Sequence, residues 1–262
     1  MVRSSFGPSR CALKTGADAY SLQSEINALQ DVGAMGAGHV PQLILADDGT
    51  ARGFEFAFYL MTYVPGPVFS ECAVAGDMLL LYGERLLARL ARLHQAGWVF
   101  GDLKGDNIVL TPDGGVQLID YGGAVRFGCA VKQFTELYDR GYWKAGGRRA
   151  EPSYDLFSLA VVLLEKAYGA HRLRRAASLP QSRNRRFLLD CVDDCAQLGP
   201  AEPVIRKMLC GEYTHSENAY HDWSKAVRAM RGRKLSGRTP WIALWFAGAL
   251  LSFLTAVWTV SR

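Results

Sequence analysis

The sequence predicts an α+β protein in which a small β-rich lobe precedes a larger helical lobe, followed by one membrane-spanning helix. Residues 1–64 alternate short, apolar, strand-like runs with a single helical pattern. After the turn residues at 65–67, amphipathic helical patterns predominate. Residues 241–260 are uncharged, and a run of about 20 such residues can cross the hydrocarbon core of a bilayer.

The small lobe is predicted from apolar periodicity and turn residues. Leu22, Ile26 and Leu29 recur on one face of a helix. The segment Asp-Asp-Gly-Thr has the composition of a turn between two strands. The expected elements are a strand end at 11–14, the helix at 21–32, strands at 40–46 and 54–64, and the turn at 47–50.

The large lobe is predicted to be mainly helical. Its first helix places Leu79, Leu86, Leu90 and Leu93 on its inner face, and Gly97 closes it. The expected elements are helices at 78–95, 155–168, 187–197 and 204–210, with two short strands around the turn 112–115. The predicted domains are the small lobe and hinge at 1–64, the large lobe at 65–227, a basic linker at 228–240 and the span at 241–260.

Composition excludes several classes of protein. Hydrophobic residues make up 49% of the chain and charged residues 21%, which is typical of a globular protein rather than a disordered one. The six cysteines show no spacing typical of a disulfide framework or a zinc site. The net charge of +5 is concentrated in two basic stretches, which begin at Arg172 and Arg228.

The C-terminal run predicts a membrane anchor. Trp241 and Trp258 lie near its ends, where interfacial aromatic residues are common. Five basic residues precede the run and only Arg262 follows it, so the positive-inside rule places residues 1–240 in the cytoplasm of the cell, at the membrane. The basic flank is expected to attract anionic membrane lipid. Gly248 and Ser252 form a small-residue pair that would suit a homodimer.

The segment 93–124 contains the residues that carry chemistry. It includes Asp102-Leu-Lys104-x-x-Asn107 and then Asp120-Tyr-Gly. Phosphoryl transfer from ATP needs a carboxylate near the acceptor hydroxyl, a cation near the transferred group and metal ligands. Asp102 suits the catalytic base and Lys104 the cation. Asn107 and Asp120 offer the oxygen ligands that Mg²⁺ prefers, with Mn²⁺ as the other candidate metal.

This segment resembles the catalytic loop and DFG motif of the Hanks-type protein kinases. The resemblance implies a protein-kinase-like bilobal fold and assigns those same roles to Asp102, Lys104, Asn107 and Asp120. Leu93-His94-x-x-Gly97 resembles the motif found just upstream of that loop.

The resemblance extends toward the N-terminus. Ala-Leu-Lys14 resembles the strand whose lysine holds the α- and β-phosphates, and Glu25 resembles its helical glutamate partner. The segment 58–66 resembles the hinge that lines the adenine pocket. By that likeness, Met61 is the gatekeeper and the backbone from Thr62 to Val64 binds adenine.

Toward the C-terminus, Tyr-Asp155-Leu-Phe-Ser resembles the helix start whose aspartate supports the catalytic loop. The sequence departs from the family elsewhere. Only 13 residues precede Lys14, and Ser-Phe-Gly-Pro-Ser at 5–9 is at best a remnant of the Gly-rich loop. Phe100 and Gly101 replace the His and Arg of the HRD motif, which disfavours switching by activation-loop phosphate. No A-P-E follows, and the segment 141–146 stands in its place.

Overall the chain is most similar to the small, tail-anchored serine/threonine kinases of spore-forming Gram-positive bacteria. That likeness implies autophosphorylation, cytoplasmic protein substrates and a role in sporulation. Two alternatives stay open. One is an atypical or small-molecule kinase, supported by the Gly101-Asp102 loop and the missing A-P-E. The other is a pseudokinase scaffold that binds nucleotide and transfers nothing.

Two hydroxyls and one basic stretch complete the candidates. Thr135 lies in the expected activation segment and Ser178 follows Arg175 by three residues, so each is an acceptor candidate with a plain surface residue as the alternative. The stretch from Arg172 to Arg186 contains six arginines and no acid. Its candidate ligands are lipid headgroups, nucleic acid and an acidic protein, against a merely solvated loop.

Overall fold

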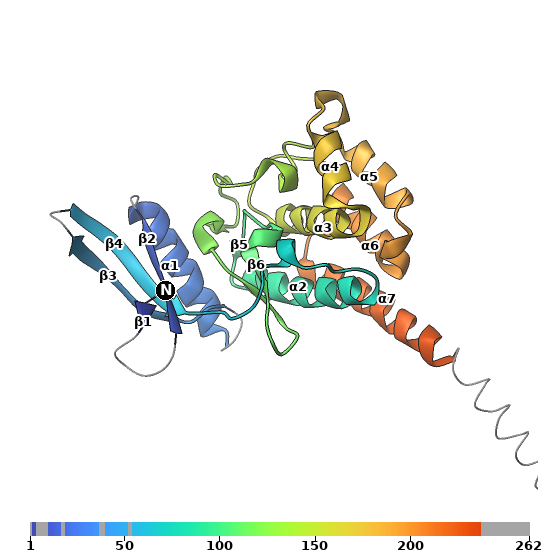
Figure 1. Ribbon diagram of the computed structural model, residues 1–262. Helices are drawn as coiled ribbons and strands as arrows, with labels where there is room; N and C mark the ends of the chain where they lie inside the picture. The colour runs from blue at the N-terminus through green and yellow to red at the C-terminus, as the bar shows by residue number, and fades with distance from the viewer. Residues whose placement is uncertain (1, 4–9, 17–18, 37–39, 52–53, 237–262) are drawn as a thin grey trace, which may run out of the picture.

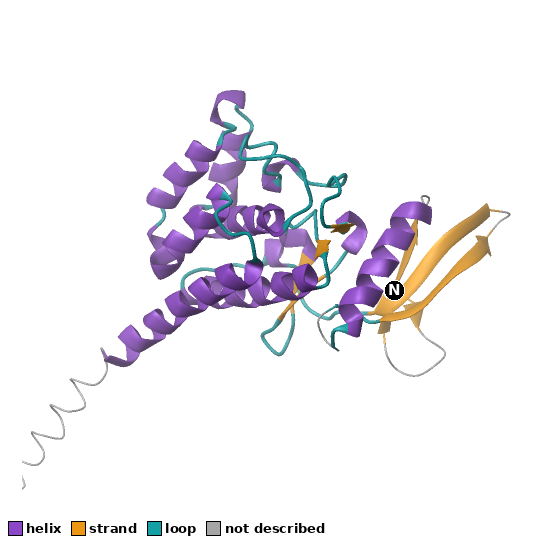
Figure 2. Ribbon diagram, turned by 180° about the vertical axis from the view of Figure 1, so that it is seen from behind, coloured by secondary structure: helices purple, strands orange, loops and turns teal. Residues whose placement is uncertain are grey.

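The computed structural model describes residues 2–3, 10–16, 19–36, 40–51 and 54–236. These residues form two lobes, one built on an antiparallel sheet and the other mainly of helices (Figures 1 and 2). Helix α1 (Ala19–Ala34) lies between the sheet and the helical lobe in both views. The predicted α+β, bilobal arrangement is therefore confirmed for the described part of the chain.

The small lobe is one four-stranded sheet with a helix against it. Its strands are β1 (Val2–Arg3), β2 (Arg10–Gly16), β3 (Leu43–Ala51) and β4 (Phe54–Thr62), arranged in the order β1-β2-β4-β3. Leu22, Ile26 and Leu29 of α1 are buried, as their helical spacing predicts. The predicted helix and the strand end at 11–14 are confirmed.

The predicted turn at 47–50 is wrong. Those residues continue β3, where Asp48 pairs with Ala57 and Gly49 pairs with Phe56 of β4. Pairing with a neighbouring strand outweighs the local turn preference of Asp and Gly. Asp47 and Asp48 are exposed on this edge strand, where charged side chains discourage pairing with other chains.

The large lobe follows the predicted helical pattern over most of its length. Its helices are α2 (Asp77–Gln95), α3 (Pro152–Tyr168), α4 (Ala170–Ala177), α5 (Arg185–Asp193), α6 (Glu202–Cys210) and α7 (Ser216–Ser236). Its short strands pair as β5 (Trp98–Val99) with β8 (Val125–Arg126) and as β6 (Ile108–Leu110) with β7 (Val116–Leu118). The four leucines predicted on the inner face of α2 are all buried.

Three details of the large lobe differ from the prediction. The helix expected at 187–197 ends at Asp193, and a 3₁₀ segment with Pro200 and a non-helical Gly199 follows it. Helix α4 was not predicted, because its arginines hide the apolar period and only Leu173 and Ala177 are known to be buried. Helix α7 was not predicted either, and it continues through Ser236, so part of the predicted basic linker is helical.

One hydrophobic core joins the lobes. Helix α3 is buried along nearly its whole length, and its core cluster extends to Leu22 and Leu29 of α1. No helix within residues 2–236, leaving out the undescribed gaps, is long and apolar enough to cross a membrane. The predicted span at 241–260 and the Gly-rich remnant at 5–9 lie outside the described residues.

Candidate active site

Three charged side chains meet at the junction of the lobes. Lys14 of β2 donates to Glu25 Oε1 of α1 at 2.9 Å and to Asp120 Oδ1 at 2.5 Å. Glu25 is 2% exposed, so its charge is compensated mainly by this lysine. Of the predicted site residues, the structure brings these three together from positions 106 residues apart in the chain.

The pairing shifts the pKa values of two of these groups. Burial by itself would lower the pKa of Lys14, but its bonds to Asp120 and Glu25 outweigh burial and raise it. Burial by itself would raise the pKa of Asp120, but Lys14 and the Gly122 N–H lower it overall. Lys14 is therefore a permanent cation at neutral pH, as binding of phosphate oxygens requires.

A second group of three surrounds the predicted base. Lys104 Nζ donates to Asp102 Oδ2 at 2.7 Å, and Thr135 Oγ1 donates to Asp102 Oδ1 at 2.8 Å. Lys104 Nζ also lies 3.2 Å from Thr135 Oγ1. The hydroxyl of Thr135 thus holds the carboxylate of Asp102 from the activation segment. The sequence singled out Thr135 only as an acceptor, because no local motif signals this long-range contact.

The two predicted metal ligands are held on neighbouring segments. Asn107 is buried; its side-chain Nδ2 donates to the Asp102 carbonyl at 2.9 Å, and its backbone carbonyl accepts from the Ile119 N–H at 2.9 Å. Because Nδ2 binds Asp102, Oδ1 is the atom of the Asn107 side chain that can act as a metal ligand, and the backbone bond holds Asn107 next to the residue that precedes Asp120. No cluster of three or more His, Cys, Asp or Glu suited to a metal occurs among the described residues. A two-ligand protein site fits Mg²⁺, which is commonly completed by substrate phosphates.

Asp155 at the start of α3 binds the backbone of the catalytic loop. Its fully buried carboxylate accepts from the backbone N–H of Phe100 at 2.6 Å and of Gly101 at 3.0 Å. His94 Nε2 lies 2.9 Å from the same carboxylate. This is the supporting role that the sequence predicted for Asp155.

Gly101 explains the missing arginine of the HRD motif. Its φ is +80°, and an added Cβ would stand 2.3 Å from the carbonyl oxygen of Gly123. No side chain fits there with this backbone. The catalytic loop and the segment after Asp120 are therefore closer than an arginine at position 101 would allow.

The predicted hinge lies at the end of β4. Met61 pairs with Ala12 of β2, two residues from Lys14. The Thr62 N–H donates to the Gln42 carbonyl, and the Thr62 hydroxyl accepts from the Gln42 N–H, so the backbone N–H of Thr62 is already engaged. Among the described residues, the Val64 N–H has no backbone partner. The adenine contacts of Met61, Thr62 and Val64 stay predictions.

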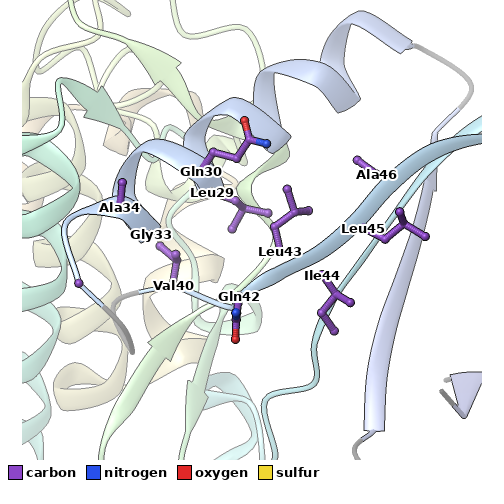
Figure 3. A pocket seen from close by; sticks show the side chains of 11 residues that line it. Leu29, Gln30, Gly33, Ala34, Val40, Gln42, Leu43, Ile44, Leu45 and Ala46 are labelled. Atoms are coloured by element: carbon purple, nitrogen blue, oxygen red, sulfur yellow. The ribbon is translucent and has the colours of Figure 1, made fainter. Parts of the chain in front are cut away.

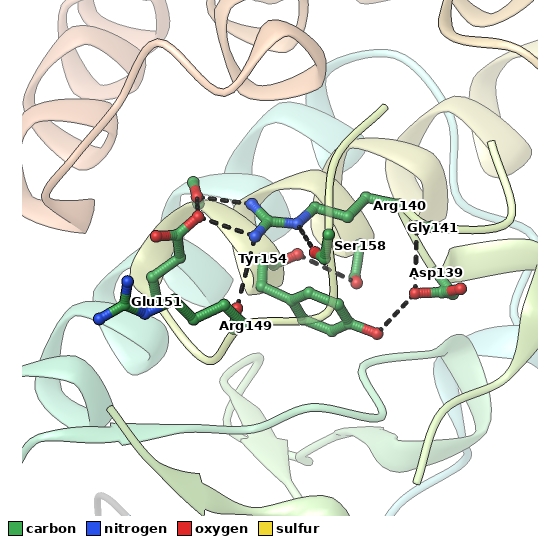
Figure 4. A network of polar contacts seen from close by, with 9 residues as sticks. Asp139, Arg140, Gly141, Arg149, Glu151, Tyr154 and Ser158 are labelled. Carbon is green, nitrogen blue, oxygen red and sulfur yellow. Dashed lines mark hydrogen bonds and ion pairs between the residues drawn. The ribbon is translucent and has the colours of Figure 1, made fainter. Parts of the chain in front are cut away.

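A polar network replaces the absent A-P-E (Figure 4). Asp139, 1% exposed, accepts two hydrogen bonds from Arg148 and one from the Tyr154 hydroxyl. The guanidinium of Arg148 lies 4.2 Å from the ring centre of Phe134, the residue before Thr135. Arg148 therefore connects Asp139 to Phe134, and Phe134 directly precedes Thr135, whose hydroxyl binds Asp102.

A second ion pair closes the same loop onto α3. Arg140, which is buried, donates to Glu151 at 2.7 Å and to the Ser153 hydroxyl at 2.8 Å (Figure 4). It also donates to the carbonyls of Gly147 and Arg149. These bonds satisfy the buried guanidinium, and the sequence contained no motif that predicted them.

Two pockets differ in their relation to these residues. One encloses about 570 Å³ beside the catalytic loop and includes Lys104 and Thr135 in its lining; we call it the acceptor pocket. The other encloses about 760 Å³ on the small lobe, between the end of α1 and β3 (Figure 3). Leu29, Val40 and Leu43 line it, and none of the predicted site residues does.

The fold and the two groups of side chains define a protein-kinase-like arrangement. A lysine and a glutamate meet an aspartate where the lobes join, and an Asp-x-Lys-x-x-Asn loop lies beneath them. No protein-family model matches the chain. Individual proteins do match it, and those compared below are named as protein kinases.

The chain is 38% identical over 163 residues to the serine/threonine-protein kinase YabT of Bacillus subtilis strain 168. That match covers 60% of this chain and 48% of the relative. Mouse serine/threonine-protein kinase PAK 4 is 34% identical over 88 residues, which cover 32% of this chain and 15% of the relative. Mitogen-activated protein kinase kinase kinase A of Dictyostelium discoideum is 28% identical over 128 residues, covering 45% of this chain and 14% of the relative.

Over part of its length the chain is thus similar to serine/threonine protein kinases, the class that its motifs indicated. It matches about half the length of the Bacillus relative and a smaller share of the other two.

Proposed function

We propose that this chain is an ATP-dependent serine/threonine protein kinase that transfers the γ-phosphoryl group to protein hydroxyls, including its own. The observation that carries the proposal is the contact of Asp102 with both Lys104 and Thr135, beside a pocket that is open to an acceptor. A base and a cation near the transferred group are two of the groups that this transfer needs from the protein, and the Thr135 hydroxyl holds the base in place.

Each side chain has a chemical role in the proposal. Asp102 orients the acceptor hydroxyl and takes its proton, and Lys104 offsets the charge on the transferred group. Lys14, oriented by Glu25, holds the α- and β-phosphates. Mg²⁺, or Mn²⁺ in its place, would be held by Asn107 and Asp120 and would neutralise phosphate charge.

The hinge would hold the base of ATP. Met61 would close the back of the adenine pocket, while the Thr62 carbonyl and the Val64 N–H would offer backbone hydrogen bonds. The Val64 N–H has no backbone partner in the described part of the chain, which supports this assignment. Adenine recognition by backbone groups leaves the hinge side chains free to vary.

The chain is further proposed to be anchored in the cell membrane by residues 241–260, with residues 1–240 facing the cytoplasm. The uncharged run and its basic flank support this. Anionic lipid is the proposed partner of the basic flank that precedes the span. Two copies of the span would pair to form a homodimer. Arg172, Arg175, Arg185 and Arg186 are exposed in the basic stretch, which supports nucleic acid as a further ligand. A role in sporulation rests on the resemblance alone.

The test is transfer from γ-labelled ATP by the full chain in detergent, with Mg²⁺ or Mn²⁺ and a general basic protein as acceptor. Asp102→Asn should lower transfer about 10²–10⁴-fold because the base is lost, with ATP affinity retained. Asp113→Asn is the matched control, since Asp113 lies in the exposed turn between β6 and β7.

Three outcomes decide between the candidate functions. Label on serine or threonine of protein, absent with Asp102→Asn, supports the protein kinase. Transfer only to small hydroxyl compounds supports the small-molecule kinase instead. ATP binding without any transfer supports the pseudokinase scaffold, and it would overturn the proposal.

A further inference from the structure

Ser178 combines exposure with closeness to the catalytic loop. It follows the last residue of α4 and is exposed. It lines the acceptor pocket together with Lys104 and Thr135, the two residues that contact Asp102. Its hydroxyl donates to the Arg175 carbonyl at 2.7 Å, a bond that solvent can replace. An accessible alcohol therefore lies in the same pocket as the transfer machinery.

The surroundings of Ser178 suit a phosphate. Arg183 donates to the carbonyls of Ala177 at 2.9 Å and Ser178 at 3.3 Å. Its guanidinium lies 4.7 Å from the ring centre of Tyr142, which restricts it further. Across the described residues, no carboxylate lies within ion-pair distance of Arg183. A positioned guanidinium that has no carboxylate partner among the described residues thus binds the backbone of Ser178.

Opposing charges are present and must be weighed. Asp106 and Glu136 also line the pocket, and the end of α4 carries a partial negative charge. Arg174 is bound to Glu165 and so contributes little. Arg183 and the exposed Arg175 are the nearest free cations along the chain to Ser178. Because charge-assisted bonds from arginine to phosphate are roughly twice as strong as neutral ones, these two favour retention of the phosphate.

We propose that Ser178 is an autophosphorylation site, an inference that rests on the proposed function. Ser178 Oγ forms a bond to the γ-phosphorus of ATP, and the bond from that phosphorus to the β–γ bridging oxygen breaks. The hydroxyl proton passes to Asp102, and ADP leaves with the electron pair. The product is phosphoserine, and Arg183 pairs with its phosphoryl oxygens.

The experiment uses the full chain in detergent with γ-labelled ATP, Mg²⁺ and a general basic protein in the same reaction. Label is located by tandem mass spectrometry in the wild type, Ser178→Ala, Ser178→Thr and Ser182→Ala. Ser182 is the matched control, because it lies four residues further along the same basic stretch but does not line the pocket. We expect Ser178→Ala to lose more than half of the autophosphorylation, and Ser178→Thr and Ser182→Ala to keep it.

The added acceptor separates the two proposals. Label on the basic protein with none at position 178 overturns the Ser178 assignment and leaves the kinase proposal standing. Equal autophosphorylation of Ser178→Ala and the wild type would also overturn the Ser178 assignment and leave the kinase proposal standing. Absence of label on every acceptor overturns both.

Discussion

The site has a nucleotide side, formed by Lys14, Glu25 and Asp120, and an acceptor floor, formed by the segment 139–151. The two are built from different kinds of residue. On the nucleotide side, Lys14, Glu25 and Asp120 occupy the positions that a kinase motif predicts, and they contact one another directly. On the acceptor floor, the expected A-P-E is missing, and Asp139–Arg148 and Arg140–Glu151 take its place. Both regions rely on ion pairs, but only the first was recognisable in the sequence.

The difference follows from what each region must do. Phosphates and metal ions constrain the type of every residue that touches them, because few side chains offer the required charge and ligand atoms. A floor has only to hold the backbone of the activation segment in place. Many combinations of buried acid, arginine and tyrosine satisfy that need, so sequence motifs there are less informative.

The largest effect is expected at the closest backbone approach next to the nucleotide side. Gly101→Ala places a Cβ against the Gly123 carbonyl at a positive φ, so the catalytic loop and the segment after Asp120 should be disturbed together. We expect the free energy of unfolding to fall by about 1–3 kcal/mol, the usual cost of a strained non-glycine residue. Denaturant unfolding measures it.

Gly147→Ala is the matched control for this change, because an added Cβ at Gly147 meets nothing within 4 Å. If Gly101→Ala unfolds at the same denaturant concentration as Gly147→Ala, the close approach of the two loops is refuted. Gly101→Arg, which restores the family residue, should be at least as unstable as Gly101→Ala.

A change confined to the floor should spare the nucleotide. Arg148→Ala removes the cation bound to buried Asp139 and the packing on Phe134. We expect kcat/KM for a protein acceptor to fall about tenfold, or ~1.4 kcal/mol, with KM for ATP unchanged. Steady-state kinetics with each substrate varied in turn will measure both.

The neighbouring Arg149→Ala is the control, since the Arg149 side chain is exposed and the hydrogen bond from Arg140 goes to the Arg149 carbonyl, which the substitution keeps. Arg148→Lys should recover part of the loss if charge matters. An equal rise in KM for ATP would show that the two regions are not separable.

Loss of an ion pair on the nucleotide side should change KM for ATP and spare the acceptor kinetics. Asp31 of α1 accepts from Arg126 at 2.5 Å and from the Trp98 indole at 2.9 Å, so it ties the helix of Glu25 to the large lobe. Both charged groups are half exposed, and such pairs contribute about 1 kcal/mol or less. Asp31→Asn should therefore raise KM for ATP only about two- to fivefold and leave acceptor kinetics unchanged.

Salt provides the discriminating measurement for Asp31. Raising ionic strength should raise KM for ATP of the wild type toward that of Asp31→Asn, because exposed pairs are screened. Asp47→Asn, an exposed carboxylate on β3, should retain the wild-type response. A response of Asp31→Asn equal to that of the wild type would contradict the role given to this pair.

Sequence prediction succeeded where local spacing or chemistry fixes the residue types, and it failed where contacts between distant segments decide the structure. Helix α2 and the core face of α1 were predictable because their leucines and isoleucine recur at helical spacing, and the Asp102 and Asp120 loops because their residue types are chemically required. The turn at 47–50 and helix α4 were not, since sheet pairing and arginine-rich packing override local preference. The contact of Thr135 with Asp102 spans 33 residues, and only the folded activation segment creates it.

The smallest expected effect tests the outer ion pair of the floor by pH. Glu151→Gln keeps the shape but removes the charge that Arg140 binds. Burial opposes ionisation, but hydrogen bonds from Arg140 and Ser153 outweigh it and lower the pKa of Glu151. Because the folded pKa lies below the unfolded value of about 4.3, the stabilisation is complete above that value and is lost as pH falls through the folded pKa.

Thermal unfolding at pH 7 and pH 3.5 measures this dependence. At pH 7, Glu151→Gln should be less stable than the wild type by about 1 kcal/mol or less, since the Glu151 side chain is 46% exposed. Nearer pH 3.5 the two should converge. Glu71→Gln, an exposed carboxylate outside the network, should show no such difference at either pH. A gap that widens in acid would mean that the folded state favours protonated Glu151, contrary to its pairing with Arg140.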